Sequence, residues 1–320
     1  MNFLEFKELY QKKAVQEISS STPKEPIVSV LVQTYQQKNF IGECLDSILM
    51  QETTFEYEIL IGEDGSVDGT REICLEYAKN YPGKIRLFLH HRENQIKVLG
   101  EATSNFNAFY NFYSAKGKYI AFCEGDDKWG DPLKLEKQVA FLKVQPSFSF
   151  VYHPFITIDD KGSTIKSEEE FSQPKIDIFK GDLLIGKYHP LLFTLCFRNV
   201  FSEIPAEMPQ VLNVDTFLLS YLGKFGAGKF LLEINPGHYR KHSGGIWSQR
   251  QKEKKFLSKI NTFRKLEYYH RREKNEEVLI YYAKQIKNTN KMLSLFYLKQ
   301  GNLRKLWNYL LASQRSAFLF

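Results

Sequence analysis

The sequence predicts an α/β fold, with a single doubly wound, mostly parallel sheet and a helical C-terminal extension. From Ile27 onward, short apolar runs rich in β-branched residues alternate with helix-like segments. This alternation is typical of a parallel sheet covered by helices on both faces. Polar residues gather where several of the apolar runs end, and beyond residue 249 the pattern becomes helical and strongly basic.

The expected elements follow one another along the chain. Residues 1–25 predict a short helix and a polar linker ahead of the sheet. Strands are expected at 27–35, 57–66, 84–90 and 118–127, and helices at 40–51, 70–81 and 103–117. The pattern then loosens, and it predicts a strand pair at 148–159, a strand at 191–199, a helix that starts at Asp215 and a strand at 230–235.

The segment DPLKLEKQVAFLKVQP, residues 131–146, predicts one further amphipathic helix. Asp131 fits its N-cap and Pro132 its first helical position. The apolar face is expected to consist of Leu133, Leu135, Val139, Phe141 and Leu142. Because Asp131 supplies the cap, the acids that lie further upstream are not needed to start this helix.

Those upstream acids are Glu124, Asp126 and Asp127, three carboxylates within four positions at the end of the strand-like run KYIAF. Clustered carboxylates repel one another, and desolvating even one of them is costly. Mg²⁺ and Mn²⁺ prefer carboxylate oxygens and often bridge to phosphates. The cluster therefore predicts a hard-cation site, and the alternative is a set of solvated loop acids.

Polar residues also follow two other predicted strands. Thr34 and Tyr35 end the first, and Glu63 and Asp64 end the second. In a doubly wound sheet, ligands bind beyond the carboxyl ends of the strands. We therefore expect these residues and the acid cluster to line one pocket.

The composition and cysteine usage are those of an ordinary globular protein. Of 320 residues, 43% are hydrophobic and 25% are charged, which suffices for one large domain or two modest ones. The four cysteines are widely spaced without a CxxC pair, which excludes an evident zinc framework and suits a reducing cytosol. The N-terminal segment lacks the apolar core of a secretory signal, and no run approaches the roughly 20 apolar residues of a spanning helix.

The charge is distributed unevenly. The chain carries a net charge of +7, yet residues 240–320 hold 19 Lys and Arg against 5 Asp and Glu. A basic tail behind an acidic body points to an anionic partner, which could be a membrane surface, a nucleic acid or a charged substrate. The alternative is a helical bundle packed on the sheet domain, and both can hold at once.

Four segments resemble, in order and spacing, the inverting glycosyltransferase family 2 with its A-type fold. They are VSVLVQTYQQKNFIGECLDSIL, EDGSVDGT, AKGKYIAFCEGDDKW and YRKHSGGIWS. The resemblance is close over residues 27–145 and patchier over 190–248. It implies that residues 26–248 form a nucleotide-sugar-binding catalytic domain, with residues 249–320 as a basic helical region behind it.

The resemblance also implies an activity, a cofactor and partners. The expected enzyme transfers a sugar, with inversion, from a UDP-, GDP- or dTDP-linked donor to a glycan or lipid-linked acceptor. It would use Mn²⁺ or Mg²⁺ and serve bacterial cell-surface polysaccharide or glycan synthesis. We expect it in the cytoplasm, or peripheral on the inner face of the plasma membrane, and we expect no nucleic-acid partner. The alternatives are a sugar-phosphate nucleotidyltransferase and a non-catalytic nucleotide-sugar-binding protein.

The family implies roles for residues at the donor end of the site. Thr34, Tyr35, Glu63 and Asp64 would hold the nucleobase, and Asp126 would bind the ribose or the edge of the metal. This chain has Gln33 where the family usually has proline and Glu63 where it has the first acid of DDGS. The alternative for EDGSVDGT is a simple turn in which Asp68 caps the following helix.

The family also implies roles at the reacting end. Asp127 would hold the metal, Arg240 the diphosphate, and His242 the diphosphate or the metal. Asp215 would deprotonate the acceptor hydroxyl, which a position near a helix N-terminus favours because it keeps the carboxylate ionised. The alternative for Asp215 is a plain helix N-cap. Glu124 stands where the family more often has an aspartate, so its direct ligation of the metal is not implied.

Overall fold

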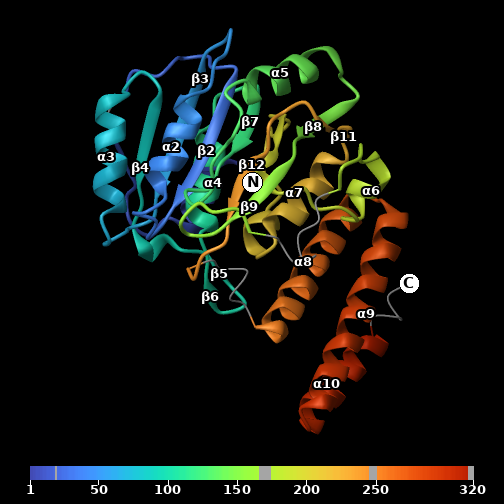
Figure 1. Cartoon of the computed structure of the whole chain (residues 1–320). Helices are drawn as coiled ribbons and strands as arrows, with labels where there is room; N and C mark the ends of the chain where they lie inside the picture. Colours follow the sequence, from blue (N-terminus) through green and yellow to red (C-terminus); the bar gives the residue numbers. More distant parts are fainter. Residues whose placement is uncertain (19, 166–173, 245–250, 316–320) are drawn as a thin grey trace.

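A long twisted sheet runs through the protein, and helices cover both of its faces (Figure 1). The computed structural model describes residues 1–18, 20–165, 174–244 and 251–315. Within these ranges the sheet has the strand order β1-β4-β3-β2-β7-β10-β8-β11. The strands are β1 Gln16–Ile18, β2 Val28–Thr34, β3 Tyr57–Glu63, β4 Ile85–Leu89, β7 Tyr119–Phe122, β8 Phe148–Tyr152, β10 Cys196–Arg198 and β11 Ala227–Phe230.

Four neighbouring strands, β4, β3, β2 and β7, are parallel and form the centre of the sheet. Their side chains alternate between two hydrophobic clusters, so that Leu31 and Leu60 lie in one cluster and Val30 and Ile59 in the other. A strand buried on both faces reads as a continuous apolar run, which explains the sequence VSVLV. The predicted mostly parallel, doubly wound sheet is confirmed.

Helices fall into two layers according to the cluster that they join. Helices α2 (Ile41–Leu49), α3 (Thr70–Asn80) and α5 (Lys134–Val144) pack on one face, and α1 (Phe3–Tyr10), α4 (Asn105–Ser114) and α7 (Val214–Leu222) on the other. The short helix α6 (Lys180–Leu184) packs beside α7. Helix α4 is unusual because its buried asparagines bond to the sheet: Asn107 Nδ2 donates to the Gly62 carbonyl at 2.7 Å.

The direction of the sheet changes beyond β7. Strand β10 runs antiparallel between β7 and β8, and β11 returns parallel to β8. A second small sheet pairs β9 (Phe155–Ile158) with β12 (Gly237–Arg240) in parallel. Backbone hydrogen bonds between Lys128 and His238 join β12 to the turn after β7, and this places Arg240 beside the acid cluster.

Several expected elements differ from the observed ones. Residues 148–159 do contain two strands, but β8 lies in the main sheet and β9 pairs with β12. The predicted strand at 230–235 is wrong, because β11 ends at Phe230 and the next residues form a turn. Strand β1 and the small hairpin of β5 (Lys97–Val98) and β6 (Glu101–Ala102) were not expected from the sequence.

The start of α5 also differs from expectation. The helix begins at Lys134, and Leu133, which was assigned to the apolar face, is 39% exposed at the position before it. Asp131 instead accepts hydrogen bonds from the Leu133 and Asn235 backbone N–H groups and from Lys137 Nζ. It therefore ties the helix start to the loop after β11 rather than capping the helix directly.

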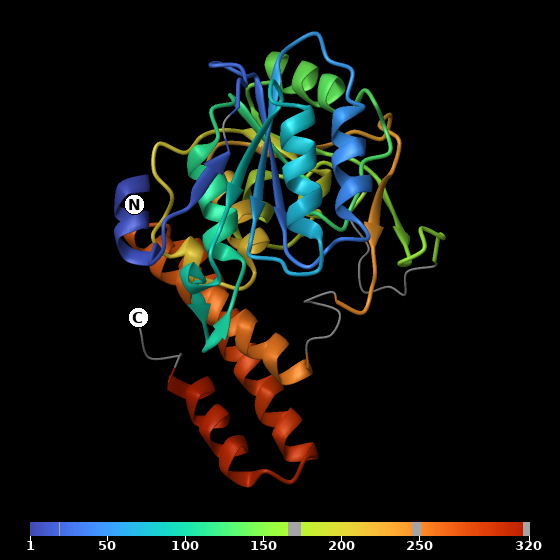
Figure 2. The ribbon, with the colours of Figure 1, turned by 90° about the vertical axis from the view of Figure 1, so that its left-hand side faces the viewer.

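The C-terminal region forms a helical arm of α8 (Lys252–Arg272), α9 (Glu276–Lys299) and α10 (Leu303–Arg315). Its base packs on the sheet domain, where Tyr282 OH donates to the Leu184 carbonyl at 2.9 Å and His270 Nε2 lies 3.0 Å from Ser220 Oγ. Its far end, at the turn between α9 and α10, projects away from the sheet (Figure 2). In the described ranges, none of the helices combines the length and apolar character needed to cross a bilayer.

Candidate active site

The carboxyl ends of β2, β3 and β7 meet at one edge of the sheet, as parallel strands require. Backbone bonds join these ends directly: the Asp64 N–H donates to the Thr34 carbonyl and the Gly125 N–H to the Gln33 carbonyl, each at 3.1 Å. Thr34, Asp64 and Asp127 are all buried there. The structure therefore brings together the three strand ends from which the sequence predicted a pocket.

One end of this edge combines an acid, an aromatic ring and a cation. Asp64 Oδ2 accepts a hydrogen bond from Arg92 Nη1 at 2.6 Å, and the same guanidinium lies 3.8 Å from the centre of the Tyr35 ring. Burial raises the pKa of Asp64 to about 6, although Arg92 opposes the rise. The Tyr35 ring is 40% exposed, so it offers a flat apolar surface next to hydrogen-bonding groups.

Arg92 was missed by the sequence reasoning. It lies in the 3₁₀ turn Arg92–Asn94 just after β4, a strand end whose polar run HHREN was available as a signal. Gly65, with φ +77°, leaves room for it, because a Cβ there would lie 3.0 Å from Arg92 Cγ. The turn after β3 is thus shaped around the arginine.

Glu63 has partners within the turn itself. It is fully buried, one carboxylate oxygen accepts the Ser66 N–H at 2.6 Å, and the other lies 2.5 Å from Arg71 Nε. These bonds order the EDGS turn. Asp68, two residues before α3, accepts from the Thr70 N–H and hydroxyl and supports the helix start, although Gly69 holds the cap position. Direct contact of Glu63 with a nucleobase stays a prediction.

The acid cluster occupies the turn after β7. Asp127 is 4% exposed, and its Oδ1 accepts the Arg240 backbone N–H at 2.9 Å. Burial, and then the charges of Asp126 and Glu124, raise the pKa of Asp127 well above its ordinary value. Burial, Asp126 and Asp215 raise the pKa of Glu124 to about 7. The effect of Asp215 on Glu124 places the start of α7 close to the cluster.

His242 is oriented by two hydrogen bonds. Its Nε2 lies 2.9 Å from Asp126 Oδ2, and its Nδ1 accepts the Gly244 N–H at 3.2 Å. With Nδ1 as acceptor, the neutral ring carries its proton on Nε2 and donates it to Asp126. His242 and Asp126 thus form a pair at the cluster. The rest of the motif, residues 245–248, lies outside the described residues.

The Arg240 side chain is 1% exposed and bonds within the protein. Its Nε donates to the Asp126 carbonyl at 3.0 Å and its Nη2 to Glu43 Oε2 at 3.0 Å. Glu43 also receives Lys128 Nζ at 2.7 Å, and Lys128 and Arg240 lower the pKa of Glu43. Glu43 was not anticipated, because an acid on an amphipathic helix reads as a solvent-facing residue. Arg240 holds the acid turn in place, and its contact with a diphosphate stays a prediction.

Asp215 lies in the first turn of α7 but does not start it. The helix begins at Val214, and Asn213 holds the cap position. The Oδ1 atom of Asp215 accepts the Thr216 N–H at 2.7 Å. The expected helix start at Asp215 is therefore wrong by one position, and the plain N-cap alternative is wrong because Asn213, two positions earlier, is the cap residue. Asp215 thus lies in the first turn of α7, where unpaired backbone N–H groups give a positive potential.

Buried polar atoms without partners among the described residues surround this edge. They are Thr34 Oγ1, Gln37 Oε1 and Gln33 Nε2. Gly125 packs closely against two of them, since a Cβ there would lie 2.4 Å from Gln37 Oε1 and 2.9 Å from Thr34 Oγ1. Buried polar groups are normally hydrogen-bonded, so these atoms fit a site that a polar ligand or water completes.

The donor atoms fit a Mg²⁺ or Mn²⁺ ion that shares its coordination with a substrate. Within the part of the chain that the structure describes, no group of three or more His, Cys, Asp or Glu side chains could hold a metal. Mg²⁺ is usually bound through one or two carboxylates together with waters and substrate phosphates rather than by an all-protein cage. Asp126 and Asp127 offer such carboxylates, and a cation would relieve the repulsion within the cluster.

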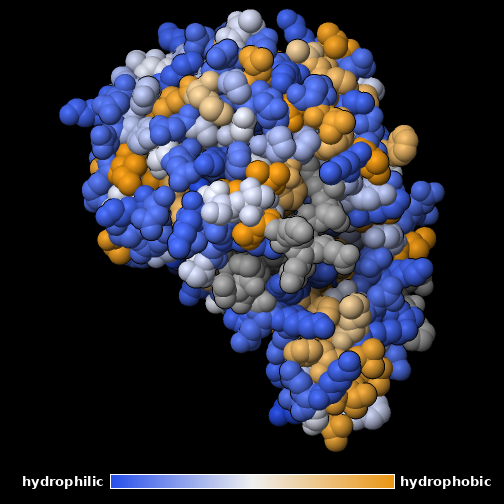
Figure 3. Space-filling view, in the orientation of Figure 1, coloured by the Kyte–Doolittle hydropathy of each residue, from blue (hydrophilic) through white to orange (hydrophobic). Residues whose placement is uncertain are grey.

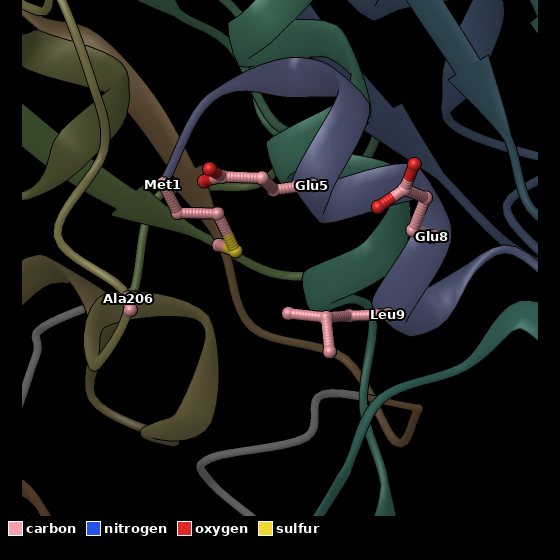
Figure 4. Close-up of a pocket in the computed structure, with 5 residues that line it drawn as sticks. All are labelled: Met1, Glu5, Glu8, Leu9 and Ala206. Carbon is pink, nitrogen blue, oxygen red and sulfur yellow. The ribbon is translucent and has the colours of Figure 1, made fainter.

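A separate hollow of about 410 Å³ lies beside helix α1, lined by Met1, Glu5, Glu8, Leu9 and Ala206 (Figure 4). The hollow is formed by the N-terminal helix and the loop around Ala206. Its lining includes none of the residues predicted for the site, and we assign it no part in the reaction.

The family model described as glycosyl transferase family 2 matches residues 29–204. This match covers more than half of the chain, and the chain therefore belongs to glycosyltransferase family 2. The matched residues form a glycosyltransferase family 2 domain, which sets the nucleotidyltransferase alternative aside.

The chain is also similar to an uncharacterized relative and to two solved structures. The uncharacterized protein Rv1520 of Mycobacterium tuberculosis is 32% identical over 69% of this chain, and the chain spans 60% of the length of that protein. Staphylococcus aureus TarS 1–349 in complex with UDP-GlcNAc has a TM-score of 0.52 at 14% identity, covering 90% of this chain and 91% of that one. The mannosyltransferase PcManGT of Pyrobaculum calidifontis, in complex with GDP-Man and Mn²⁺, has a TM-score of 0.51 at 15% identity, covering 99% and 91%. These two likenesses confirm the expected A-type fold and nothing further.

Proposed function

We propose that the protein is a metal-dependent inverting glycosyltransferase that transfers a sugar from a nucleotide donor to an acceptor hydroxyl. The observation that carries the proposal is the juxtaposition of two groups on one sheet edge: the acid, ring and cation of Asp64, Tyr35 and Arg92, and the acid cluster with Asp215 beside it. The first group suits a nucleobase, and the second suits a diphosphate with its cation.

At the donor end, each side chain has a distinct task. The Tyr35 ring stacks on the base, and the ionised Asp64 accepts a hydrogen bond from a ring N–H. Arg92 already lies on the Tyr35 ring, so it shifts aside or joins the stack when the base enters. Thr34 Oγ1, now without a partner among the described residues, gains one.

At the reacting end, the protein holds the diphosphate and removes one proton. Asp126 and Asp127 would hold a divalent ion, and such an ion, when bound, would neutralise charge developing on the leaving diphosphate. The acceptor oxygen forms a bond to the anomeric carbon as the bond from that carbon to the diphosphate oxygen breaks. Asp215 takes the acceptor's proton, and direct displacement from the opposite face inverts the configuration.

The biological setting is part of the same proposal. Structural neighbours were solved with UDP-GlcNAc and with GDP-Man, which supports a nucleotide-linked donor of this kind, with UDP, GDP or dTDP as the leaving group. We propose a glycan or lipid-linked acceptor and a role in bacterial cell-surface polysaccharide or glycan synthesis. A lipid-linked acceptor would be met in the cytoplasm, at the inner face of the plasma membrane.

The test is a screen of nucleotide sugars by thermal shift, with and without Mn²⁺, on the wild type and on Asp127→Ala. We expect one donor to raise the melting temperature only when Mn²⁺ is present, and we expect Asp127→Ala to lose both this effect and transfer while still folding. Glu76→Ala, which removes an exposed acid on α3, serves as the matched control and should behave as wild type. Full activity of Asp127→Ala, or of the wild type in EDTA, would contradict the metal role.

A further inference from the structure

The last part of the chain is basic without any balancing acid. After Glu277 the sequence contains no Asp or Glu in its remaining 43 residues, and it contains seven Lys and Arg. This segment forms most of α9 and all of α10. The imbalance is therefore concentrated in the part of the arm that extends away from the sheet domain (Figures 1 and 2).

The same part of the arm exposes large apolar side chains. On α10, Leu303, Trp307 and Leu311 are 60%, 58% and 47% exposed, and their spacing of four residues places them on one face of the helix. At the end of α9, Leu295 and Leu298 are more than half exposed as well. We call these five side chains the tip surface. Figure 3 shows hydrophobic residues gathered at this end of the molecule.

The tip surface is not needed to hold α10 in place. The opposite side of α10 packs on the arm, where Leu306 and Tyr309 join the cluster of Phe256, Leu293 and Tyr297. The Tyr309 ring stacks on Tyr297 with 5.6 Å between centroids. Helix α10 is thus fixed by one face and presents a second, apolar face outward.

Charge identifies the partner that fits this surface. Lys291, Lys299 and Arg304 are exposed on the same two helices, so the apolar side chains lie among cations. Helices with an apolar face containing Trp and Leu and a basic polar face bind in the plane of anionic membranes. A second copy of the chain would instead bring two such cationic surfaces together, which like-charge repulsion opposes.

We propose that the tip surface docks on an anionic phospholipid bilayer, with Leu303, Trp307 and Leu311 entering the interface and the neighbouring cations binding lipid headgroups. The inference deepens, and rests on, the membrane-side setting proposed above, but it is independent of the sugar-transfer chemistry. Because the tip surface lies at the far end of the arm, docking leaves the sheet domain clear of the bilayer.

The experiment is flotation of the full-length protein with vesicles of phosphatidylcholine alone or mixed with phosphatidylglycerol, at rising salt. We expect flotation only with the anionic vesicles, falling as salt increases. The variant Lys291→Gln/Lys299→Gln/Arg304→Gln should lower the vesicle partition coefficient about a hundredfold, since each basic residue near such a surface contributes about a factor of five. The variant Leu303→Gln/Trp307→Gln/Leu311→Gln should lose binding to a similar or greater extent.

The matched control replaces three exposed apolar residues outside the arm, Leu4, Val144 and Leu232, by glutamine, and it should float as wild type. Melting and nucleoside-diphosphate binding are measured on every variant, so that loss of docking is separated from misfolding and from failure of the proposed catalytic role. Flotation indifferent to lipid charge, or unchanged in the Leu303/Trp307/Leu311 variant, would overturn the proposal. So would a lipid-free dimer in sedimentation equilibrium that this variant abolishes.

Discussion

Four carboxylates lie in one region at the edge of the sheet: Glu124, Asp126, Asp127 and Asp215. They differ in the group that compensates the negative charge of each. Asp127 has a backbone N–H from Arg240, Asp126 has His242, and Asp215 has the N–H of Thr216. Burial and the charges of Asp126 and Asp215 raise the pKa of Glu124 to about 7, so it releases its proton less readily than a free glutamic acid. These surroundings give acids of the same chemical type different tasks.

Asp215 is the residue whose substitution separates catalysis from structure most clearly. Asp215→Asn keeps an oxygen that can accept the Thr216 N–H but removes the proton acceptor. We expect turnover to fall by roughly 10²–10⁴-fold, with donor and metal binding retained. Asp215→Ala should lose turnover and also about 0.5–1 kcal/mol of stability from the first turn of α7. Kinetics and melting of both variants provide the measurement, and near-normal turnover of Asp215→Asn would place the base elsewhere.

Asp64 predicts a pH dependence of donor binding. Burial raises the pKa of Asp64 to about 6. Between about pH 4 and pH 6 the folded protein therefore holds a proton on this carboxyl that the unfolded chain has released. The contribution of Asp64 to the free energy of unfolding falls as pH rises through that window. Donor affinity changes in the opposite sense, since the ionised carboxylate accepts from a base N–H more strongly than the protonated acid does, and it should rise through about pH 6 and then level off.

The measurement for Asp64 is calorimetric donor binding from about pH 5 to about pH 8, compared between wild type and Asp64→Asn. The variant should bind more weakly at neutral pH and lose most of the pH dependence, while Glu124, which titrates nearby, contributes equally to both proteins. An identical pH profile in the variant would mean that Asp64 serves only the turn.

At the scale of elements, helix α4 packs closely against the sheet at Gly62. A Cβ at this position would lie 1.7 Å from Asn107 Oδ1, and Asn107 also donates to the Gly62 carbonyl. Gly62→Ala should therefore destabilise the protein by about 1–3 kcal/mol or more. In the Asn107→Ala background the same substitution should cost less, because the nearest clashing side chain is gone and the remaining close contact is Asn111 Nδ2 at 2.9 Å from the Cβ. Urea unfolding of the two single variants and the double variant measures this coupling, and additive costs would contradict it.

The parallel centre of the sheet could be predicted from the sequence because its strands are buried on both faces and read as long apolar runs. The edges could not. Strand β1 is three residues long with two exposed positions. Strand β11 is defined by its pairing with β8, which the sequence does not reveal. The apolar run FLLEIN fits the pattern of a strand better than the residues of β11 do. Asp131 fits a cap by local sequence, but its partner Asn235 is brought to it by tertiary packing.

The candidate site likewise contains residues that could be predicted from the sequence and residues that could not. Residues at strand ends, such as Thr34, Asp64 and Asp127, could be placed together from topology alone. Glu43 and Arg92 could not, since their roles follow from which side chains they contact across 197 and 28 positions of the chain. The buried state of Arg240 was equally invisible, because its sequence context of basic residues reads as a solvent-facing cluster.

At the scale of the whole molecule, the chain joins an acidic sheet domain to a basic helical arm. The arm is anchored through α8 and the start of α9, and the exposed apolar side chains of the tip surface lie at its far end. This separation lets binding to a charged surface and catalysis rest on different residues. Variants of the tip surface and of the acid cluster should therefore affect the two functions independently.

The central claim is metal-dependent transfer with inversion at the anomeric carbon, and the stereochemistry of the first-formed product tests it most directly. The measurement is proton NMR of the reaction of wild-type protein with Mn²⁺ and the α-linked nucleotide sugar that stabilises it most, using water or a simple alcohol as acceptor. We expect the β-anomer to form first, no product with EDTA, and turnover lower by roughly 10²–10⁴-fold with Asp215→Asn. A first-formed α-anomer, or unchanged turnover in EDTA, would contradict the account.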